Sequence, residues 1–296
     1  YVTSSANQLY DWKVAGGVVS YSRTISLASG SDPCGLAISA DGTKAYVCLS
    51  IKNKLAVVNL TSGTVSQQIT VGIAPWDVVL SPDGNTAYVS DWGGRYPTTG
   101  DLTMTSAGTA VVVDERGVPT SGVISVVNLT SGVEAAQVAT GLHPSDLVLS
   151  PDGGTLYVAN AMSDTVSVID TQTKKVRETI LVRPSSTLPF GNSSTLPFGS
   201  IPDGLALSAD GTNLFVAVAG NNAVAVVELR NAQHTNSVVQ GFFPTDWYPG
   251  AVVADSNYVY VANVKGLGTR YGQPATTAYT PTRYYLGTAN TITIHT

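Results

Sequence analysis

Residues that could perform acid–base or metal chemistry are few in this sequence. Its only histidines are His143, His234 and His295, and none is spaced from another histidine, a cysteine or a carboxylate as metal ligands are. The sequence has neither the Gly-x-Ser-x-Gly motif of a nucleophilic serine nor a glycine loop that holds phosphate. A lone loop histidine such as His143 is more often a hydrogen-bonding residue than an acid or base. We therefore expect no catalytic residue, no metal and no cofactor.

The two cysteines form a candidate disulfide pair. Cys34 begins one expected strand and Cys48 ends the next, with a turn signal at Asp41 and Gly42 between them. Folding this hairpin would bring the thiols near each other, so we expect a disulfide, with two buried thiols as the alternative. A disulfide closing this segment would stabilise the fold by about 3 kcal/mol in the chain-entropy model.

The composition excludes several classes of protein. The chain has 296 residues, of which 43% are hydrophobic and 12% charged, which is typical of a folded chain and not of a disordered one. Its net charge is -5 and its 15 Lys and Arg are scattered, so a nucleic-acid partner is not expected. No apolar run approaches the ~18 residues of a transmembrane helix. Tyr1 begins without a signal-peptide pattern, so any signal peptide is expected to have been removed, and the Ser-, Thr-, Asn- and Gly-rich composition indicates an extracytoplasmic protein: periplasmic, secreted or at the cell surface.

One phrase of about fifteen residues recurs and determines the elements that position any site. Each copy has a proline, a short apolar run, a turn such as Ser-Pro-Asp-Gly, and a second apolar run. The copies occupy residues 33–47, 75–89, 144–158 and 202–216, with a degraded copy at 249–261. Their aromatic markers are 42, 69, 58 and 45 residues apart, so the period is about 42 with two large insertions. A period of ~40–45 residues is the signature of β-propeller blades.

Each repeat is expected to contain four antiparallel strands. In the first complete repeat these are residues 36–39, 45–49, 55–60 and 65–71. No stretch has helical periodicity, so we predict an all-β chain that forms a single β-propeller domain over residues 1–296. Three strands at each end and four complete blades between them predict six to seven blades, of which the terminal ones are incomplete in this chain.

Several phrases resemble a known repeat. SPDGxTxYVxN, TVSVID and NAVAVVEL are similar to the YVTN-type β-propeller repeat, and this resemblance covers nearly the whole chain. Residues 88–95, 108–117 and 241–270 resemble more specifically the N-terminal propeller of bacterial proteins that carry a C-terminal phosphoesterase of the alkaline phosphatase superfamily. That resemblance implies a seven-bladed propeller, with the metal ligands and the nucleophile in the phosphoesterase half.

Long insertions predict the functional surface. In a propeller blade, the loop entering the first strand and the loop joining the second to the third share one face. The insertions at 91–122, 182–201 and 264–285 all fall on that face, and function usually lies on such loops. Its aromatic, charged and amide side chains suit a polar small ligand or a partner chain, although packing between blades is the alternative for Trp92 and Trp247. The candidate binding residues are Trp76, Asp91, Trp92, Arg95, His143, Asp203, Asp246, Trp247, Tyr248, Lys265 and Arg270.

Three functions are compatible with these observations. The leading hypothesis is a non-catalytic binding or scaffolding propeller that mediates protein–protein contact or self-association. The second is a substrate-gating propeller that forms part of a phosphoesterase. The third is a structural protein of a surface layer or filament, in which unpaired strands or long loops join neighbouring subunits. The ligand, the oligomeric state and the way in which the ring closes do not follow from the sequence.

Overall fold

The structure is a computed structural model, and it describes the chain except for residues 185–198, 232–234, 266–287 and 294–296. The described residues form strands together with two 3-10 turns, η1 (Ser50–Lys52) and η3 (Ala219–Asn221), so the prediction of an all-β chain is confirmed. They fall into two compact units, Tyr1–Val158 with Ile169–Val176, and Ala159–Val168 with Arg177–Thr296. Within the described part of the chain, no helix is long and apolar enough to span a membrane.

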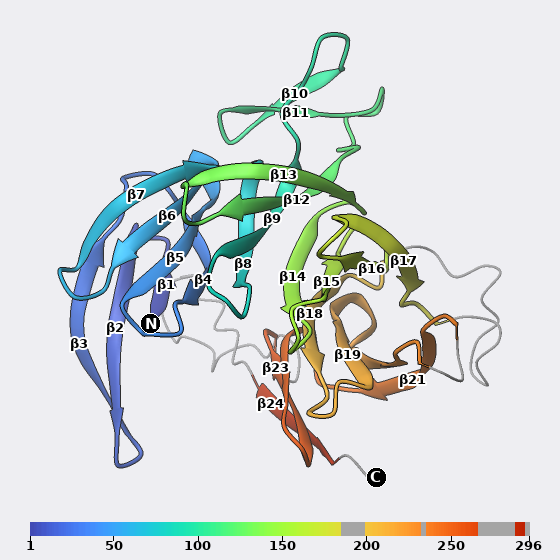
Figure 1. The fold of residues 1–296 in the computed structure, drawn as a ribbon. Coiled ribbons are helices and arrows are strands. Elements are labelled where there is room, and N and C mark those ends of the chain that lie inside the picture. Colours follow the sequence, from blue (N-terminus) through green and yellow to red (C-terminus); the bar gives the residue numbers. More distant parts are fainter. Residues whose placement is uncertain (185–198, 232–234, 266–287, 294–296) are drawn as a thin grey trace, which may run out of the picture. The chain divides into compact units, whose positions relative to one another are not determined.

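The first unit contains three antiparallel sheets of the repeat (Figure 1). The first sheet is β1 (Val2–Ser4), β2 (Gln8–Ala15) and β3 (Val18–Ser26). The second is β4 (Pro33–Ile38), β5 (Lys44–Leu49), β6 (Lys54–Asn59) and β7 (Thr64–Thr70). The third is β8 (Ile73–Leu80), β9 (Thr86–Gly94), β12 (Gly122–Asn128) and β13 (Val133–Thr140). The connection from β9 to β12 carries an additional hairpin, β10 (Thr103–Ser106) and β11 (Thr109–Val112), which projects beyond the third sheet.

Three further sheets follow in the sequence. The fourth is β14 (Pro144–Leu149), β15 (Thr155–Asn160), β16 (Thr165–Asp170) and β17 (Lys175–Leu181), and its residues are divided between the two units. The fifth is β18 (Pro202–Leu207), β19 (Asn213–Val218), β20 (Ala223–Glu228) and β21 (Val238–Pro244). The sixth is β22 (Pro249–Ala254), β23 (Tyr258–Asn263) and β24 (Thr288–Thr293). Among the described residues there are thus four sheets of four strands between two of three, as the repeat spacing predicts.

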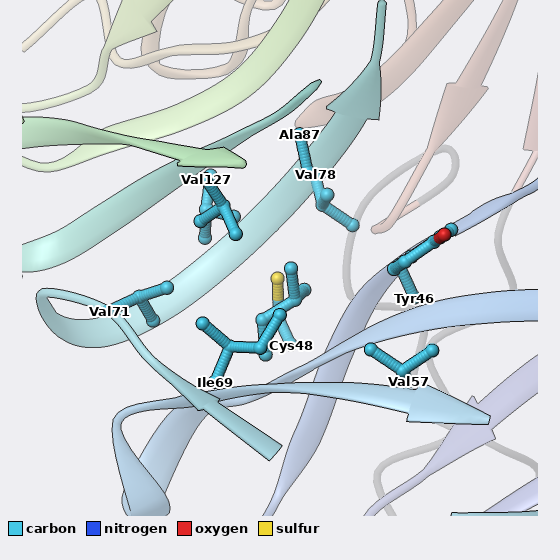
Figure 2. Close-up of a cluster of buried hydrophobic side chains, with 10 residues drawn as sticks. Tyr46, Cys48, Val57, Ile69, Val71, Val78, Ala87 and Val127 are labelled. Carbon is cyan, nitrogen blue, oxygen red and sulfur yellow. The ribbon is translucent and has the colours of Figure 1, made fainter. Parts of the chain in front are cut away.

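Apolar side chains from neighbouring sheets form the cores. Figure 2 shows Cys48 and Ile69 of the second sheet directed toward Val78 and Val127 of the third. The middle strands are buried on both faces and read as continuous apolar runs, whereas the outer strand β7 is mostly exposed and buries only Ile69. Each buried valine or leucine contributes about 1.5–3 kcal/mol, so packing between sheets is the main stabilising term.

Consecutive sheets are also joined by the side chain of an asparagine or aspartate. This residue lies in the turn just before β2, β6, β16 or β20. Four such residues have φ between 51° and 61°, a left-handed conformation that Asn and Asp tolerate. Each Oδ1 accepts a hydrogen bond of 2.9–3.3 Å from the backbone N–H of the residue before the proline that begins the next sheet. We call this contact the Asx link. The four pairs are Asn7 with Asp32, Asn53 with Ala74, Asp164 with Ile201, and Asn222 with Tyr248.

The proline at or near the start of each later sheet is flanked by backbone irregularities. In all five cases the residue before it has φ between 45° and 64°. A β-bulge follows the proline in β4, β8, β18 and β22. A bulge sets two residues against one on the partner strand and redirects their side chains. These irregularities therefore determine where the side chains beside the proline point. The five residues before the prolines are Asp32, Ala74, His143, Ile201 and Tyr248.

The two cysteines lie on the adjacent antiparallel strands β4 and β5, as predicted. The bulge in β4 sets Cys34 and Gly35 opposite Cys48. Both cysteines are free, and the Cys34 thiol donates a 3.5 Å hydrogen bond to the carbonyl of Asp32, within its own turn. The expected disulfide is therefore not present in the structure, and its formation in solution stays a prediction.

Candidate functional site

The first part of the 91–122 insertion is braced internally by a defined set of polar contacts. Arg95 Nη1 and Nη2 form a two-point ion pair with the carboxylate of Asp101, at 2.7 and 2.8 Å. Thr98 donates to the same carboxylate through both its backbone N–H and its hydroxyl, at 2.6 and 2.9 Å. These bonds lower the pKa of Asp101 well below its usual range, with the Arg95 contact the largest cause. Arg95 thus acts in the structure as a support for the loop that leads into β10.

Three aromatic side chains from three elements form a continuous array beside this insertion. The rings of Trp76, in β8, and Trp92, in β9, are 5.3 Å apart with an interplanar angle of 30°. The imidazole of His143, before β14, lies 4.4 Å from the Trp92 ring at 45°. Trp76 and Trp92 are each 39% exposed, so part of both ring faces is open to solvent. We call these three residues the aromatic array.

A pocket of about 320 Å³ opens between the aromatic array, η1 and the β10–β11 hairpin. It lies entirely within the first unit. Its lining combines apolar side chains with a few hydroxyls, one amide and one imidazole. The apolar side chains are Ile51, Ile73, Ala74, Trp92, Met104, Ala107, Val111, Val113 and Pro119, and the polar ones are Ser50, Asn53, Thr105, Ser106, Thr109 and His143.

The pocket is electrically neutral. Among the described residues that line it, none is Asp, Glu, Lys or Arg. Burial lowers the pKa of His143 below its usual value, so its imidazole is neutral at pH 7. Asn53 is committed on both sides, because Oδ1 accepts from the Ala74 N–H and Nδ2 donates to Thr109 Oγ1 at 3.0 Å. A charged ligand would be desolvated here without a counter-charge, which is unfavourable.

Asp91, the residue before Trp92, is fully buried in the structure. Ser125 Oγ accepts a 3.0 Å hydrogen bond from the Gly72 N–H, lies 2.6 Å from Asp91 Oδ2, and also bonds Glu134 Oε1. A serine hydroxyl has one proton and can donate to only one of these two carboxyls, so the other carboxyl must be protonated to share the same oxygen. Burial, with a smaller contribution from the charge of Glu134, raises the pKa of Asp91 well above its usual value. We assign the proton to Asp91.

A second pair of carboxyls lies on β8 and β14. Asp77 hydrogen-bonds Asp146 and accepts from the backbone N–H groups of Val78 and Leu147. Burial raises the pKa of Asp77. Because Leu147 belongs to the following sheet, Asp77 ties two neighbouring sheets through the backbone, which is a structural role.

The second unit holds another group of candidates. The Lys265 ammonium lies 4.5 Å from the Tyr248 ring centroid and 5.8 Å from that of Trp247, in a cation–π geometry. Burial and the charge of Asp203 raise the pKa of Tyr248. Trp247 is 43% exposed, and Asp246 makes interactions of its own.

The structure therefore divides the predicted site residues. Trp76, Trp92 and His143 come together in one array, whereas Asp91 and Arg95 hold the adjoining backbone. Arg270 and most of the insertions at 182–201 and 264–285 lie outside the described residues. The prediction that all three insertions share one face stays a prediction.

Sequence reasoning missed Asn53, Met104 and Ser125. Asn53 carries a recognisable signal, because an Asn or Asp stands directly before the following strand at every Asx link. Met104 and Ser125 carry none, since their importance comes from contacts with residues distant in sequence. Among the described residues, no three His, Cys, Asp or Glu side chains gather closely enough to hold a metal ion.

Comparison with known proteins places this geometry in a fold class. A family model described as a YNCE-like β-propeller matches residues 96–187, less than half of the chain. Two solved structures superpose on most of the chain. Hydrazine synthase of Kuenenia stuttgartiensis is 17% identical, with 88% of this chain and 90% of that chain covered and a TM-score of 0.50. A functionally unknown protein from Desulfotomaculum acetoxidans is 15% identical, with 89% and 72% covered and a TM-score of 0.62.

The chain is a β-propeller. At these identities the similarity concerns the fold of the propeller alone. No curated protein sequence matches the propeller significantly. Its function must therefore be argued from its own residues.

Proposed function

We propose that this propeller is a non-catalytic binding module that acts outside the cytoplasm and contacts its partner through the aromatic array and the β10–β11 hairpin. The observation that carries the proposal is the array itself, in which two half-exposed tryptophan rings and an imidazole stand beside a projecting hairpin. Tryptophan rings combine a large apolar face with an N–H donor and are enriched at binding surfaces. The composition, rich in small polar residues, supports the extracytoplasmic location.

The polar residues around the array support binding over catalysis. Arg95 is committed to Asp101, and Asp91 is enclosed with Ser125 and Glu134. A general acid or base must reach a substrate proton within hydrogen-bonding distance, whereas these groups face one another. They give the aromatic array a rigid support.

The test is a variant without the hairpin. An ideal Cβ at Gly94 would lie 2.4 Å from the Ser121 carbonyl oxygen, so the two ends of the insertion already meet. Residues 95–120 are therefore replaced by Asn-Gly, a dipeptide suited to a two-residue turn. Light scattering over a concentration series measures self-association, with Trp247→Ala as a control of similar exposure in the other unit. The proposal expects the shortened protein to keep its melting temperature within a few degrees and to lose association; unchanged association in the folded variant would exclude this surface.

A separate observation favours the structural-protein alternative. The β2–β3 hairpin exposes five large apolar side chains, and the Trp12 and Tyr21 rings on it pack edge to face at 5.6 Å. Exposed apolar strands are templates for pairing between copies. If this hairpin joins subunits, Val14→Lys and Val19→Lys abolish association while the shortened 95–120 variant retains it. The five side chains are Trp12, Val14, Val18, Val19 and Tyr21.

The phosphoesterase alternative is supported only by the sequence resemblance of residues 88–95, 108–117 and 241–270. It proposes that the propeller gates substrate for a phosphoesterase in a longer parent chain. Hydrolysis of p-nitrophenyl phosphate by this chain alone would contradict the non-catalytic proposal. Failure of the chain to alter the kinetics of a phosphoesterase domain from its parent would contradict the alternative.

A further inference from the structure

The pocket beside the aromatic array has the properties of a small-ligand site, and its chemistry limits what can enter. Its volume of about 320 Å³ is at the lower end of the range for small-molecule pockets, about 300–1,000 Å³. Its lining includes the Trp92 ring and, from the β10–β11 hairpin and the residue after it, Met104, Val111 and Val113. The space therefore suits one or two flat rings more than an extended chain.

The aromatic end of this pocket offers hydrogen-bonding groups from two ring side chains. The His143 imidazole lies against Trp92 at a tilt of 45° and makes no hydrogen bond within the described part of the chain, and the same holds for the Trp92 indole N–H. The neutral imidazole offers one donor and one acceptor, and the indole offers one donor. The Asn53 amide, by contrast, already donates to Thr109 Oγ1 and accepts from the Ala74 N–H.

We infer that this pocket binds a small, uncharged, planar ring compound, stacked beside Trp92 and hydrogen-bonded at its edge by His143. The absence of charged side chains among its described lining residues disfavours both anions and cations. Met104 and the hairpin valines cover the second face of the ring, and a thioether packs well at aromatic edges. This inference deepens the proposed binding role and rests on it, because Trp92 and His143 line the pocket and also belong to the proposed contact surface.

Three probes of nearly equal shape and different charge test the inference: 2-naphthamide, 2-naphthoate and 2-naphthamidine. Binding is followed by NMR through the indole N–H signals of the four tryptophans, Trp12, Trp76, Trp92 and Trp247. We expect 2-naphthamide to shift the Trp92 and Trp76 signals and to leave those of Trp12 and Trp247 in place. The two charged analogues should bind at least tenfold more weakly.

Variants locate the site. Met104→Ala removes one wall, at a residue that is 57% exposed, and should weaken 2-naphthamide binding several-fold without unfolding the protein. Trp92→Phe keeps a ring and should weaken binding less than Trp92→Ala. Trp247→Ala is the matched control and should leave the affinity unchanged.

Several results would overturn the inference. They are equal or tighter binding of a charged analogue, shifts centred on Trp247, or no saturable binding by the wild-type protein. Binding that requires a tryptophan-containing peptide and is absent for 2-naphthamide would overturn it in favour of a polypeptide partner. The light-scattering test uses no probe, so the two proposals can fail separately. If association requires the hairpin but no probe binds, the ligand site is rejected and the contact surface is retained.

Discussion

Asn53 offers the sharpest test of how the propeller holds its sheets together. Its side chain is buried, its φ is 54°, and its Oδ1 accepts from the Ala74 N–H at 2.9 Å. Asn53→Ala would leave that partly buried N–H without its partner, at about 1–3 kcal/mol. It would also place a Cβ-bearing residue that lacks a polar side chain in the left-handed region, at about 1–2 kcal/mol. We expect the free energy of unfolding to fall by about 2–4 kcal/mol.

Thermal unfolding measures this loss. In a chain of this size 1 kcal/mol corresponds to a change in Tm of about 2–4 °C, so the expected drop is on the order of 5–10 °C. Asn53→Gly restores only the backbone freedom, and Asn53→Asp keeps the acceptor while losing the donor to Thr109. Stability should therefore increase in the order alanine, glycine, aspartate. Asn222→Ala breaks the same link at an exposed position, where water can replace the bond, and should cost about 1 kcal/mol.

Two results would refute this reasoning. A Tm for Asn53→Ala within about 1 °C of wild type would show that the Asx link does not hold the second and third sheets together. Equal losses for Asn53→Asp and Asn53→Ala would show that the accepted hydrogen bond is not the stabilising contact. The 2-naphthamide assay on Asn53→Asp separates stability from pocket shape, since this residue also lines the pocket.

Three further outcomes are expected. Because the pKa of Asp91 is raised in the folded state, its contribution to stability is present below its unfolded pKa of about 3.9 and is lost as pH rises through the folded pKa. Asp91→Asn should therefore flatten the fall of Tm between pH 4 and 8. An unchanged slope would contradict the assignment of the proton to Asp91. Gly35→Ala should lower the free energy of unfolding by about 1–3 kcal/mol or more, because the added Cβ would come within 2.6 Å of the β8 backbone. The control Gly241→Ala adds a Cβ that meets nothing within 4 Å, and its free energy of unfolding should stay within about 0.5 kcal/mol of wild type. Denaturant unfolding measures both. Burial raises the pKa of the Cys34 thiol to about 11, so iodoacetamide should label the folded protein slowly at pH 8; unfolding without reductant then tests the disulfide, because full labelling of Cys34 and Cys48 excludes it.

The strands and their grouping into sheets follow from the sequence because each repeat carries its own alternation and its own turn signal. Asp41, for example, accepts from the Ser39 hydroxyl and the Thr43 N–H inside one turn, so the five residues from Ser39 to Thr43 contain all the information needed. The same local logic predicts three strands at each end and four complete blades between them. Because the same signal occurs in several repeats, the prediction of strands and turns rests on several independent observations.

The site does not follow in the same way. The aromatic array joins Trp76, Trp92 and His143, whose spacing in the sequence has no regular pattern. The sequence places Asp91 at the start of an exposed insertion, but β9 continues to Gly94. The Asp91 carboxyl therefore lies against Gly72, where an added Cβ would come within 2.6 Å of this carboxyl. Within the described residues, the β10–β11 hairpin has no counterpart in the other repeats, so its signal is not repeated there. Contacts between distant residues, and not local pattern, determine these features.

The Asx link uses only the backbone N–H of the residue before each proline, so the side chain at that position is left free to vary. Four of the five residues before a proline take part in an Asx link, and the fifth, His143, shares their left-handed backbone. The five side chains are as different as aspartate, alanine, histidine, isoleucine and tyrosine, at Asp32, Ala74, His143, Ile201 and Tyr248. Two of them, His143 and Tyr248, belong to the two groups of candidate residues. Evolution can therefore exchange recognition chemistry at these points without rebuilding the scaffold, and a protein engineer who wishes to graft new specificity onto this propeller should begin there.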